Sequence, residues 1–211
     1  MIRNIVFDVG KVLVSYEPDQ MMDRLGFDQK TKDAVNKAMY ATELWNECDK
    51  GTYSTEEFID LFVANAPEYE KQIREAFVHT PDAIELLPHA VDWILDMKAQ
   101  GYHVYILSNY GEYNFEKTKE KMKFLPLMDG AVFSYQCKMI KPNEDIYLHI
   151  LDEYWLEPEE TIFIDDRIEN VETARKLGIH GVVFENYEQA SAELKKICEE
   201  KFQTSITDAG F

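Results

Sequence analysis

Two patterns of hydrophobic positions divide this chain. Residues 5–14, which read I-V-F-D-V-G-K-V-L-V, form a short apolar run rich in Val and Ile that a single acid, Asp8, interrupts. Such a run is typical of a buried parallel strand, so we expect Asp8 at the C-terminal end of a strand, where open α/β sheets place their sites. On the strand alone, Asp8 fits equally well as a cap for the following turn.

The residues from Ser15 to about Thr80 show helical periodicity and no convincing strand. The best-marked helix begins at Ser54, where Ser54 and Glu57 have the spacing of a capping box and Phe58 opens an apolar stripe. Before it, residues 45–53 (W-N-E-C-D-K-G-T-Y) form an aromatic and acidic turn that either faces a substrate or joins two helices. We interpret this region as a helical insertion.

From Asp82 onward, short apolar strands alternate with amphipathic helices, which indicates βαβ units and a parallel sheet. We predict strands at 103–107, 131–133, 161–164 and 181–184, and helices at 88–100, 112–122, 145–154, 168–177 and 187–202. In the first helix, Val91, Ile94 and Leu95 are expected to face the core. The predicted fold is therefore an α/β, Rossmann-like parallel sheet core (residues 1–14 and 81–211) with an inserted α-helical cap (residues 15–80).

The composition narrows the classes of partner. The chain has 211 residues, of which 45% are hydrophobic, enough for one substantial core. No window approaches the roughly 18 apolar residues of a membrane span, so we expect no membrane partner and a cytoplasmic location. A net charge of −18 disfavours nucleic acid, whose phosphates bind to basic surfaces. The three cysteines have neither disulfide nor zinc-site spacing, and the sequence indicates no oligomeric state.

Polar residues follow two of the later strands. Ser108 and Asn109 end one of them, where backbone N–H groups at a helix start can hold a phosphate, although Ser-Asn is also ordinary turn chemistry. Lys141, followed by Pro142, comes shortly after the next strand and taken alone resembles a surface lysine.

The strand I-F-I runs directly into Asp165 and Asp166. Two adjacent carboxylates repel each other, so a partly buried pair calls for a cation, and Mg²⁺ suits carboxylates and phosphate. Such a cation would also make the site locally positive, so that an acidic protein could bind a phosphorylated ligand. Alternatively, an acidic residue is favoured at the N-terminus of the next helix, but this preference explains one of the two aspartates more easily than both. Asn170, one turn into the next helix, is a candidate to orient a carboxylate.

Taken together, these segments resemble a known superfamily. The order Phe7-Asp8-x-Gly10, Leu107-Ser108-Asn109, Lys141-Pro142 and Asp165-Asp166 is similar to the four motifs of the haloacid dehalogenase-like (HAD) hydrolases. Within that superfamily the chain resembles the branch that includes α-D-glucose-1-phosphate phosphatases. The resemblance to this branch lies in F-D-V-G-K-V, in L-S-N, and in Trp45, Gly51, Ser54, Glu57 and Phe58 of the insertion.

The resemblance implies hydrolysis of a small phosphorylated metabolite, such as a sugar phosphate, through an aspartyl phosphate on Asp8. It implies that Ser108 and the backbone of Asn109 bind phosphate oxygens and that Lys141 neutralises charge. The implied ligands of Mg²⁺ are Asp8, the carbonyl of Gly10, Asp165 and Asp166. The candidates for substrate specificity, from the cap, are Trp45, Glu47 and Asp49.

At one position the chain departs from this pattern. Most phosphatases of the superfamily carry a general acid and base two residues after the nucleophile, where this chain has Gly10. Such a group typically contributes ~10²–10⁴-fold. One hypothesis is that a sugar 1-phosphate is preferred, because its anomeric hydroxyl leaves more readily unprotonated. Glu17, Glu47 and Asp49 are alternative acids, none of which the sequence singles out. Lys11, next to Gly10, could contact substrate, but we expect it to point to solvent.

Three other activities share part of the pattern. A metal-independent 2-haloacid dehalogenase also lacks the second aspartate, but without a metal the pair Asp165-Asp166 would repel its carboxylate substrate. A non-catalytic phosphate-binding module would fit Gly10 but not the retained Asp8 and Lys141. A receiver-like phosphoacceptor has its acid pair near the N-terminus and no insertion of this size. We therefore predict a Mg²⁺-dependent phosphomonoester hydrolase.

Overall fold

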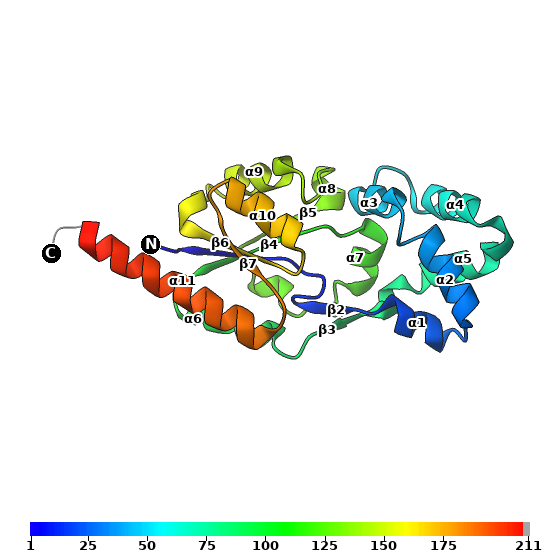
Figure 1. The fold of residues 1–211 in the computed structure, drawn as a ribbon, viewed down its shortest axis with the longest axis horizontal. Coiled ribbons are helices and arrows are strands. Elements are labelled where there is room, and N and C mark those ends of the chain that lie inside the picture. The colour runs from blue at the N-terminus through cyan, green and yellow to red at the C-terminus, as the bar shows by residue number, and fades with distance from the viewer. Residues whose placement is uncertain (209–211) are drawn as a thin grey trace.

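A computed structural model describes the backbone of residues 1–208 and the side chains of residues 1–200. Among these residues the main sheet has five parallel strands in the order β5-β4-β1-β6-β7 (Figure 1). The strands are β1 (Asn4–Phe7), β4 (His103–Ser108), β5 (Gly130–Phe133), β6 (Thr161–Asp165) and β7 (His180–Val183). The predicted α/β, Rossmann-like class is confirmed.

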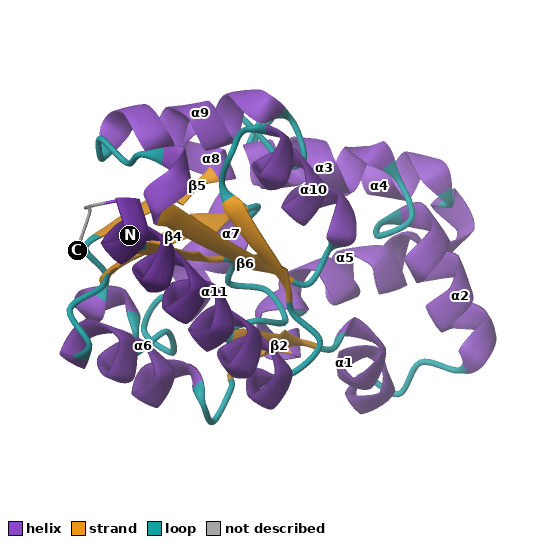
Figure 2. Ribbon diagram, turned by 60° about the vertical axis from the view of Figure 1, so that its left-hand side comes forward, coloured by secondary structure: helices purple, strands orange, loops and turns teal. Residues whose placement is uncertain are grey.

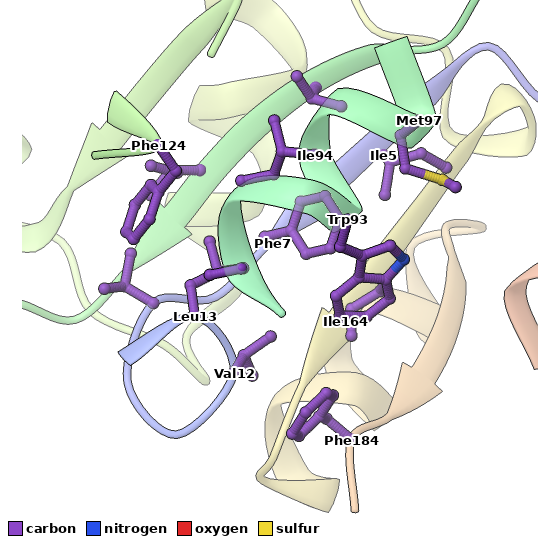
Figure 3. Close-up of a cluster of buried hydrophobic side chains, with 14 of the residues drawn as sticks. Ile5, Phe7, Val12, Leu13, Trp93, Ile94, Met97, Phe124, Ile164 and Phe184 are labelled. Carbon is purple, nitrogen blue, oxygen red and sulfur yellow. The ribbon is translucent and has the colours of Figure 1, made fainter. Parts of the chain in front are cut away.

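Helices cover both faces of this sheet (Figure 2). On one face, Val6 of β1 packs in a buried cluster with α9 (Glu144–Glu153) and α10 (Ile168–Lys176). On the other face, Ile5 and Phe7 pack in a second cluster with α6 (Ala90–Ala99) and α11 (Tyr187–Asp208). Figure 3 shows this second cluster, in which Phe7 meets Trp93 of α6 edge to face, with ring centroids 4.9 Å apart. Alternate β1 side chains thus anchor two helical layers, which makes β1 the centre of the molecule.

The strand order fixes where a site can form. From β1 the chain passes to β4 and β5 on one side, and later to β6 and β7 on the other. Phe7 is in register with both Ile106 and Ile164. Because the central strands end at the same level, the residues that follow them meet at one edge of the sheet, at a topological switch point.

Residues 17–83, which we call the helical segment, form a second hydrophobic core. The capping box that begins α4 is confirmed: Ser54 Oγ accepts from Glu57 N at 3.3 Å, and the Glu57 carboxylate accepts from Ser54 N at 2.9 Å. The helices are α1 (Pro18–Arg24), α2 (Gln29–Ala38), α3 (Glu43–Lys50), α4 (Thr55–Asn65) and α5 (Glu70–Val78). The buried side chains of this core include Met22, Val35, Phe58, Phe62, Ile73 and Phe77.

A small antiparallel ribbon joins the helical segment to the sheet domain. It consists of β2 (Val14–Tyr16) and β3 (Ile84–Leu86), in which Val14 pairs with Leu86 and Tyr16 with Ile84. The expectation of no strand after Ser15 was therefore wrong, since β2 extends to Tyr16. Its pairing partner lies some 70 residues away, where no local pattern reveals it.

Other differences concern helix ends and faces. Leu95, expected to face the core, is 46% exposed, and α6 buries Trp93 instead. The helix predicted at 112–122 ends sooner, as α7 (Glu112–Thr118), and α11 continues beyond Phe202 to Asp208. The remaining elements are α8 (Ser134–Cys137) and the 3₁₀ turns Pro67–Tyr69, Thr80–Ala83, Leu125–Leu127 and Pro158–Glu160. Within the described residues, no helix is both long and apolar enough to cross a membrane.

Candidate active site

The ends of two neighbouring strands, β1 and β6, bring together acids that lie far apart in the sequence. Asp8 follows β1, whereas Asp165 ends β6 and Asp166 comes next. The Asp8 N–H donates to Ile164 O at 2.9 Å, which extends the sheet pairing by one residue and seats Asp8 beside Asp165. One carboxylate oxygen from each of the three acids lies within 4.8 Å of the other two. The acids are thus close enough to share a single ion.

Lys141 is buried between two of these carboxylates. Its Nζ lies 2.9 Å from Asp8 Oδ1 and 2.6 Å from Asp165 Oδ2, and it donates to Leu107 O at 2.9 Å. Burial lowers the pKa of Lys141, but the charges of Asp165 and Asp8 outweigh burial and the net pKa is raised. Lys141 is therefore a permanent cation whose charge is fixed next to Asp8.

Two asparagine side chains hold these charged groups in place. The Asn109 amide donates to Lys141 O at 2.9 Å and accepts from Lys141 N at 2.8 Å, so this side chain clamps the lysine backbone. The Asn109 side chain is thus engaged with Lys141, and the phosphate contact expected of Asn109 concerns its backbone. Asn170 Nδ2 donates to both oxygens of Asp165, at 2.9 and 3.0 Å, which fixes the plane of that carboxylate.

The electrostatics of this cluster favour a cation and an anion together. Burial raises the pKa of Asp8, with Lys141 opposing and Asp165 adding to the shift, and burial with Asp165 also raises that of Asp166. A hard divalent cation would relieve this repulsion, and carboxylate oxygens are the ligands that Mg²⁺ prefers. Ser108 Oγ is buried beside Asp8, whose pKa it lowers, and makes no hydrogen bond of ordinary geometry with the described residues, so it can still turn to a ligand. The donor set therefore fits Mg²⁺ and a phosphate.

A cavity of about 220 Å³ opens in front of the cluster, between the sheet and the helical segment. Asp8 and Gly10 line it on the sheet side, and Trp45 and Asp49 of α3 line it on the other. The Trp45 ring packs against Tyr40, with centroids 4.6 Å apart, which ties this wall to the second core. Two of the three residues expected to determine specificity therefore face the cavity.

The third of these residues, Glu47, is placed differently. Its carboxylate accepts from Lys50 Nζ at 2.8 Å and from Thr52 Oγ1 at 2.7 Å, outside the cavity lining. The helical turn of α3 separates Glu47 from Asp49 by about 200°, so the two acids cannot both face the same cavity. Glu47 therefore lies outside the cavity lining, and its part in substrate specificity stays a prediction.

Two basic residues line the cavity that the sequence analysis did not place there, Lys11 and Arg167. Lys11 was expected to point to solvent, and its side chain is 60% exposed, but its Nζ lies 3.9 Å from Asp166 Oδ2 and lines the cavity. Arg167 also lines the cavity, and its backbone N–H donates to Asp165 Oδ1 at 2.8 Å. Its position directly after the acid pair was a usable signal. Nothing in the sequence marked Tyr110, Gly111 and Asn114, which complete this part of the wall.

The chain matches the haloacid dehalogenase-like hydrolase family over residues 16–184 and belongs to it. Among curated relatives, D-ribitol-5-phosphate phosphatase from Bacteroides thetaiotaomicron is 26% identical over 197 residues, which cover 88% of this chain and 93% of that protein. The structure of a predicted HAD-like family hydrolase from Porphyromonas gingivalis has a TM-score of 0.70 at 26% identity, covering 94% of this chain and 98% of the other. A HAD family enzyme from Bacteroides thetaiotaomicron, solved with magnesium and inorganic phosphate, shares the fold, with a TM-score of 0.69 at 23% identity and coverage of 87% and 94%.

Proposed function

We propose that this hydrolase is a Mg²⁺-dependent phosphomonoesterase that acts on a small phosphorylated metabolite, of which a sugar phosphate is the best-supported class. The observation that carries the proposal is the placement of Asp8, whose Oδ1 contacts Lys141 Nζ at 2.9 Å while the carboxylate stands within 4.8 Å of Asp165 and Asp166. The activity of the ribitol-phosphate relative supports the same class of substrate.

In the proposed reaction, a carboxylate oxygen of Asp8 attacks phosphorus, the ester oxygen leaves, and water then hydrolyses the aspartyl phosphate. Lys141 keeps Asp8 ionised and neutralises the approaching phosphate, because its charge is buried and cannot be screened by water. The Ser108 hydroxyl, which is buried beside Asp8, and the Asn109 backbone N–H would hold phosphate oxygens. The protein thus contributes mainly position and charge, which is what phosphoryl transfer requires.

The residues that would hold Mg²⁺ are Asp8, the carbonyl of Gly10, Asp165 and Asp166. When bound, the ion would supply positive charge to the phosphoryl oxygens. Asn170 would keep Asp165 in one orientation, since it donates to both of its oxygens.

We propose that the helical segment is a cap over this site. Its α3 forms one wall of the cavity, and the β2–β3 ribbon is its covalent connection to the sheet domain. A cap in this position would exclude water during attack on phosphorus and contact the leaving group.

The first test is a phosphate-release assay on a panel of sugar and polyol phosphates, with Mg²⁺, with EDTA, and with Mg²⁺ restored. We expect release that EDTA abolishes and Mg²⁺ restores. Asp8→Asn should lower kcat by roughly 10³-fold or more, because it removes the nucleophile. Asp92→Asn, an exposed acid of α6, is the charge-matched control and should retain full activity.

Two results would contradict the proposal. Chloride release from 2-chloropropionate that is undiminished in EDTA would identify a dehalogenase. Binding of phosphomonoesters without any release of phosphate would identify a non-catalytic module. Circular dichroism of Asp8→Asn would establish that its loss of activity is not a loss of fold.

A further inference from the structure

The cavity wall formed by the helical segment contains an acid, Asp49, that has no role in the proposed reaction. Asp49 lies near the C-terminal end of α3 and lines the same cavity as Asp8 and Gly10. Gly10 has no side chain to protonate a leaving group, and the wall opposite it comes from the helical segment. The carboxyl group of Asp49 is therefore on the side from which a proton donor has to come.

Contacts with the sheet domain hold Asp49 in this position. Ser134 Oγ donates to Asp49 O at 2.6 Å and accepts from Tyr110 N at 2.9 Å, which links the α3 backbone to the end of β4. Two residues further on, Lys138 Nζ donates to Gly51 O at 2.8 Å. These bonds fix the end of α3 against the core, so that the Asp49 side chain has a defined place in the cavity.

Gly111 allows the close approach of this acid. A Cβ at Gly111 would lie 3.4 Å from Asp49 Oδ1 and 3.3 Å from Cys48 O, closer than most real contacts. The Gly111 N–H lies near the Asp49 carboxyl group and lowers its pKa, and Gly111 immediately precedes α7. The Asp49 carboxyl group thus lies against the start of α7 and at the same time lines the cavity.

The surroundings of Asp49 raise the pKa of its carboxyl group well above the usual range of an aspartic acid. Burial raises its pKa from 3.8 to about 7; the Gly111 N–H opposes the shift, and the charge of Asp8 adds to it. Lys141 and Arg167 lower the pKa of Asp49. The other titratable groups that face it are Tyr16, Cys48 and Tyr110.

The alternative acids do not share this environment. Glu47 is held ionised by Lys50 and Thr52, whose hydrogen bonds lower its pKa. Glu17 lines a different surface hollow, where its carboxylate accepts from Gln20. Of the three acids that the sequence offered as substitutes for the missing group, the structure singles out Asp49.

We propose that Asp49 is the general acid of the first half-reaction, delivering a proton from the helical segment to the ester oxygen of the substrate. This inference rests on the proposed phosphomonoesterase function. As the P–O bond breaks, the proton moves from Asp49 to that oxygen, so that a neutral alcohol leaves and Asp49 becomes a carboxylate. In the second half-reaction the carboxylate accepts a proton from the water that attacks the aspartyl phosphate, which restores the acid.

A general acid at Asp49 would widen the range of substrates. An enzyme without a general acid needs a leaving group that departs readily as an anion, such as the anomeric oxygen of a sugar 1-phosphate. With Asp49 as the acid, phosphates of ordinary primary alcohols are equally suitable substrates.

The test compares Asp49→Asn with wild type on two substrates, using kcat/KM because it reports the steps up to departure of the leaving group. With D-ribitol 5-phosphate, a primary alkyl phosphate, we expect kcat/KM to fall by ~10²–10⁴-fold. With p-nitrophenyl phosphate, whose leaving group needs no proton, it should change by less than about threefold. Asp33→Asn, an exposed acid of α2 whose side chain accepts from Gln29 and which lies outside the cavity lining, should leave both values unchanged.

The pH profile provides a second readout. Because the acid must carry its proton, wild-type kcat/KM for the alkyl phosphate should fall as the pH rises through about 7, the pKa of Asp49. This alkaline limb should be absent with p-nitrophenyl phosphate and absent from Asp49→Asn. Asp49→Glu, which retains a carboxyl group, should recover part of the alkyl phosphatase activity.

Equal losses on both substrates would mean that Asp49 only holds α3 in place, and would overturn the inference. Unchanged kcat/KM on both would do the same. Either result leaves the proposed function intact, provided that the wild type still releases phosphate with Mg²⁺. Failure of the proposed function would instead appear as absence of phosphate release by the wild type.

Discussion

At the scale of single residues, the site depends on where Lys141 is held. A buried ammonium is stable only when paired, and Lys141 is paired with Asp8 and Asp165. Its side chain can reach both acids because Asn109 fixes its backbone from two directions, at the N–H and at the carbonyl. One neutral side chain thus determines the position of the charge that faces the phosphate.

Asn109→Ala tests this clamp. It leaves two backbone groups of Lys141 without their partner, so we expect the free energy of unfolding to fall by ~1–3 kcal/mol in urea denaturation. We also expect kcat to fall by roughly tenfold or more, because small displacements of a positioning group are costly in catalysis. Asn143→Ala, in the same loop but with an exposed side chain that caps nothing, is the control. If Asn109→Ala and Asn143→Ala behave alike, the clamp has no role.

At the scale of elements, the important contact is that between α3 and the turn that begins α7. This contact leaves little room for a larger side chain, because a Cβ at Gly111 would lie 3.3 Å from Cys48 O. Gly111 has a φ of −73°, an ordinary value, so this glycine is required for space and not for backbone freedom.

Gly111→Ala should therefore push α3 away by a few tenths of an ångström. We expect a loss of about 1–2 kcal/mol in unfolding free energy from overpacking. A several-fold fall in kcat/KM for an alkyl phosphate should accompany it, because α3 carries one wall of the cavity. Glu112→Ala, the exposed neighbour, is the control. Wild-type kinetics and stability in Gly111→Ala would show that α3 is not tightly seated.

The elements also show how far the sequence alone can be interpreted. Strands such as β1 and β6 were predictable, because the apolar run indicates a buried strand and the acid that follows it marks where the strand ends. The β2–β3 ribbon was not, because Ser15 and Glu85 pair across 70 residues and neither segment is a strong strand alone. Asp49 and Glu47 are two residues apart on one helix, and only the docking of α3 decides which of them faces the cavity.

At the scale of the whole molecule, the net charge opposes the proposed substrate. The chain has 40 acidic and 22 basic side chains, and its charge of −18 repels a phosphate dianion at long range. Lys141, Lys11 and Arg167 are concentrated at the site, so attraction begins only at short range. The approach of substrate thus depends on a long-range repulsion from the acidic surface and a short-range attraction to the basic residues of the site.

Changing the salt concentration distinguishes the long-range repulsion from the short-range attraction. Raising ionic strength from about 0.01 to 0.15 M shortens the Debye length from about 30 to 8 Å, which screens the distant acids more than the buried Lys141. With Mg²⁺ kept saturating, we therefore expect kcat/KM for a dianionic phosphate to rise by roughly 2–10-fold over this range, and isosmolar sucrose to leave it unchanged. A fall in kcat/KM would mean that the cations at the site already control the approach from a distance. In that case the acidic surface would have no influence on substrate capture, and its contribution would be confined to keeping copies of the chain apart.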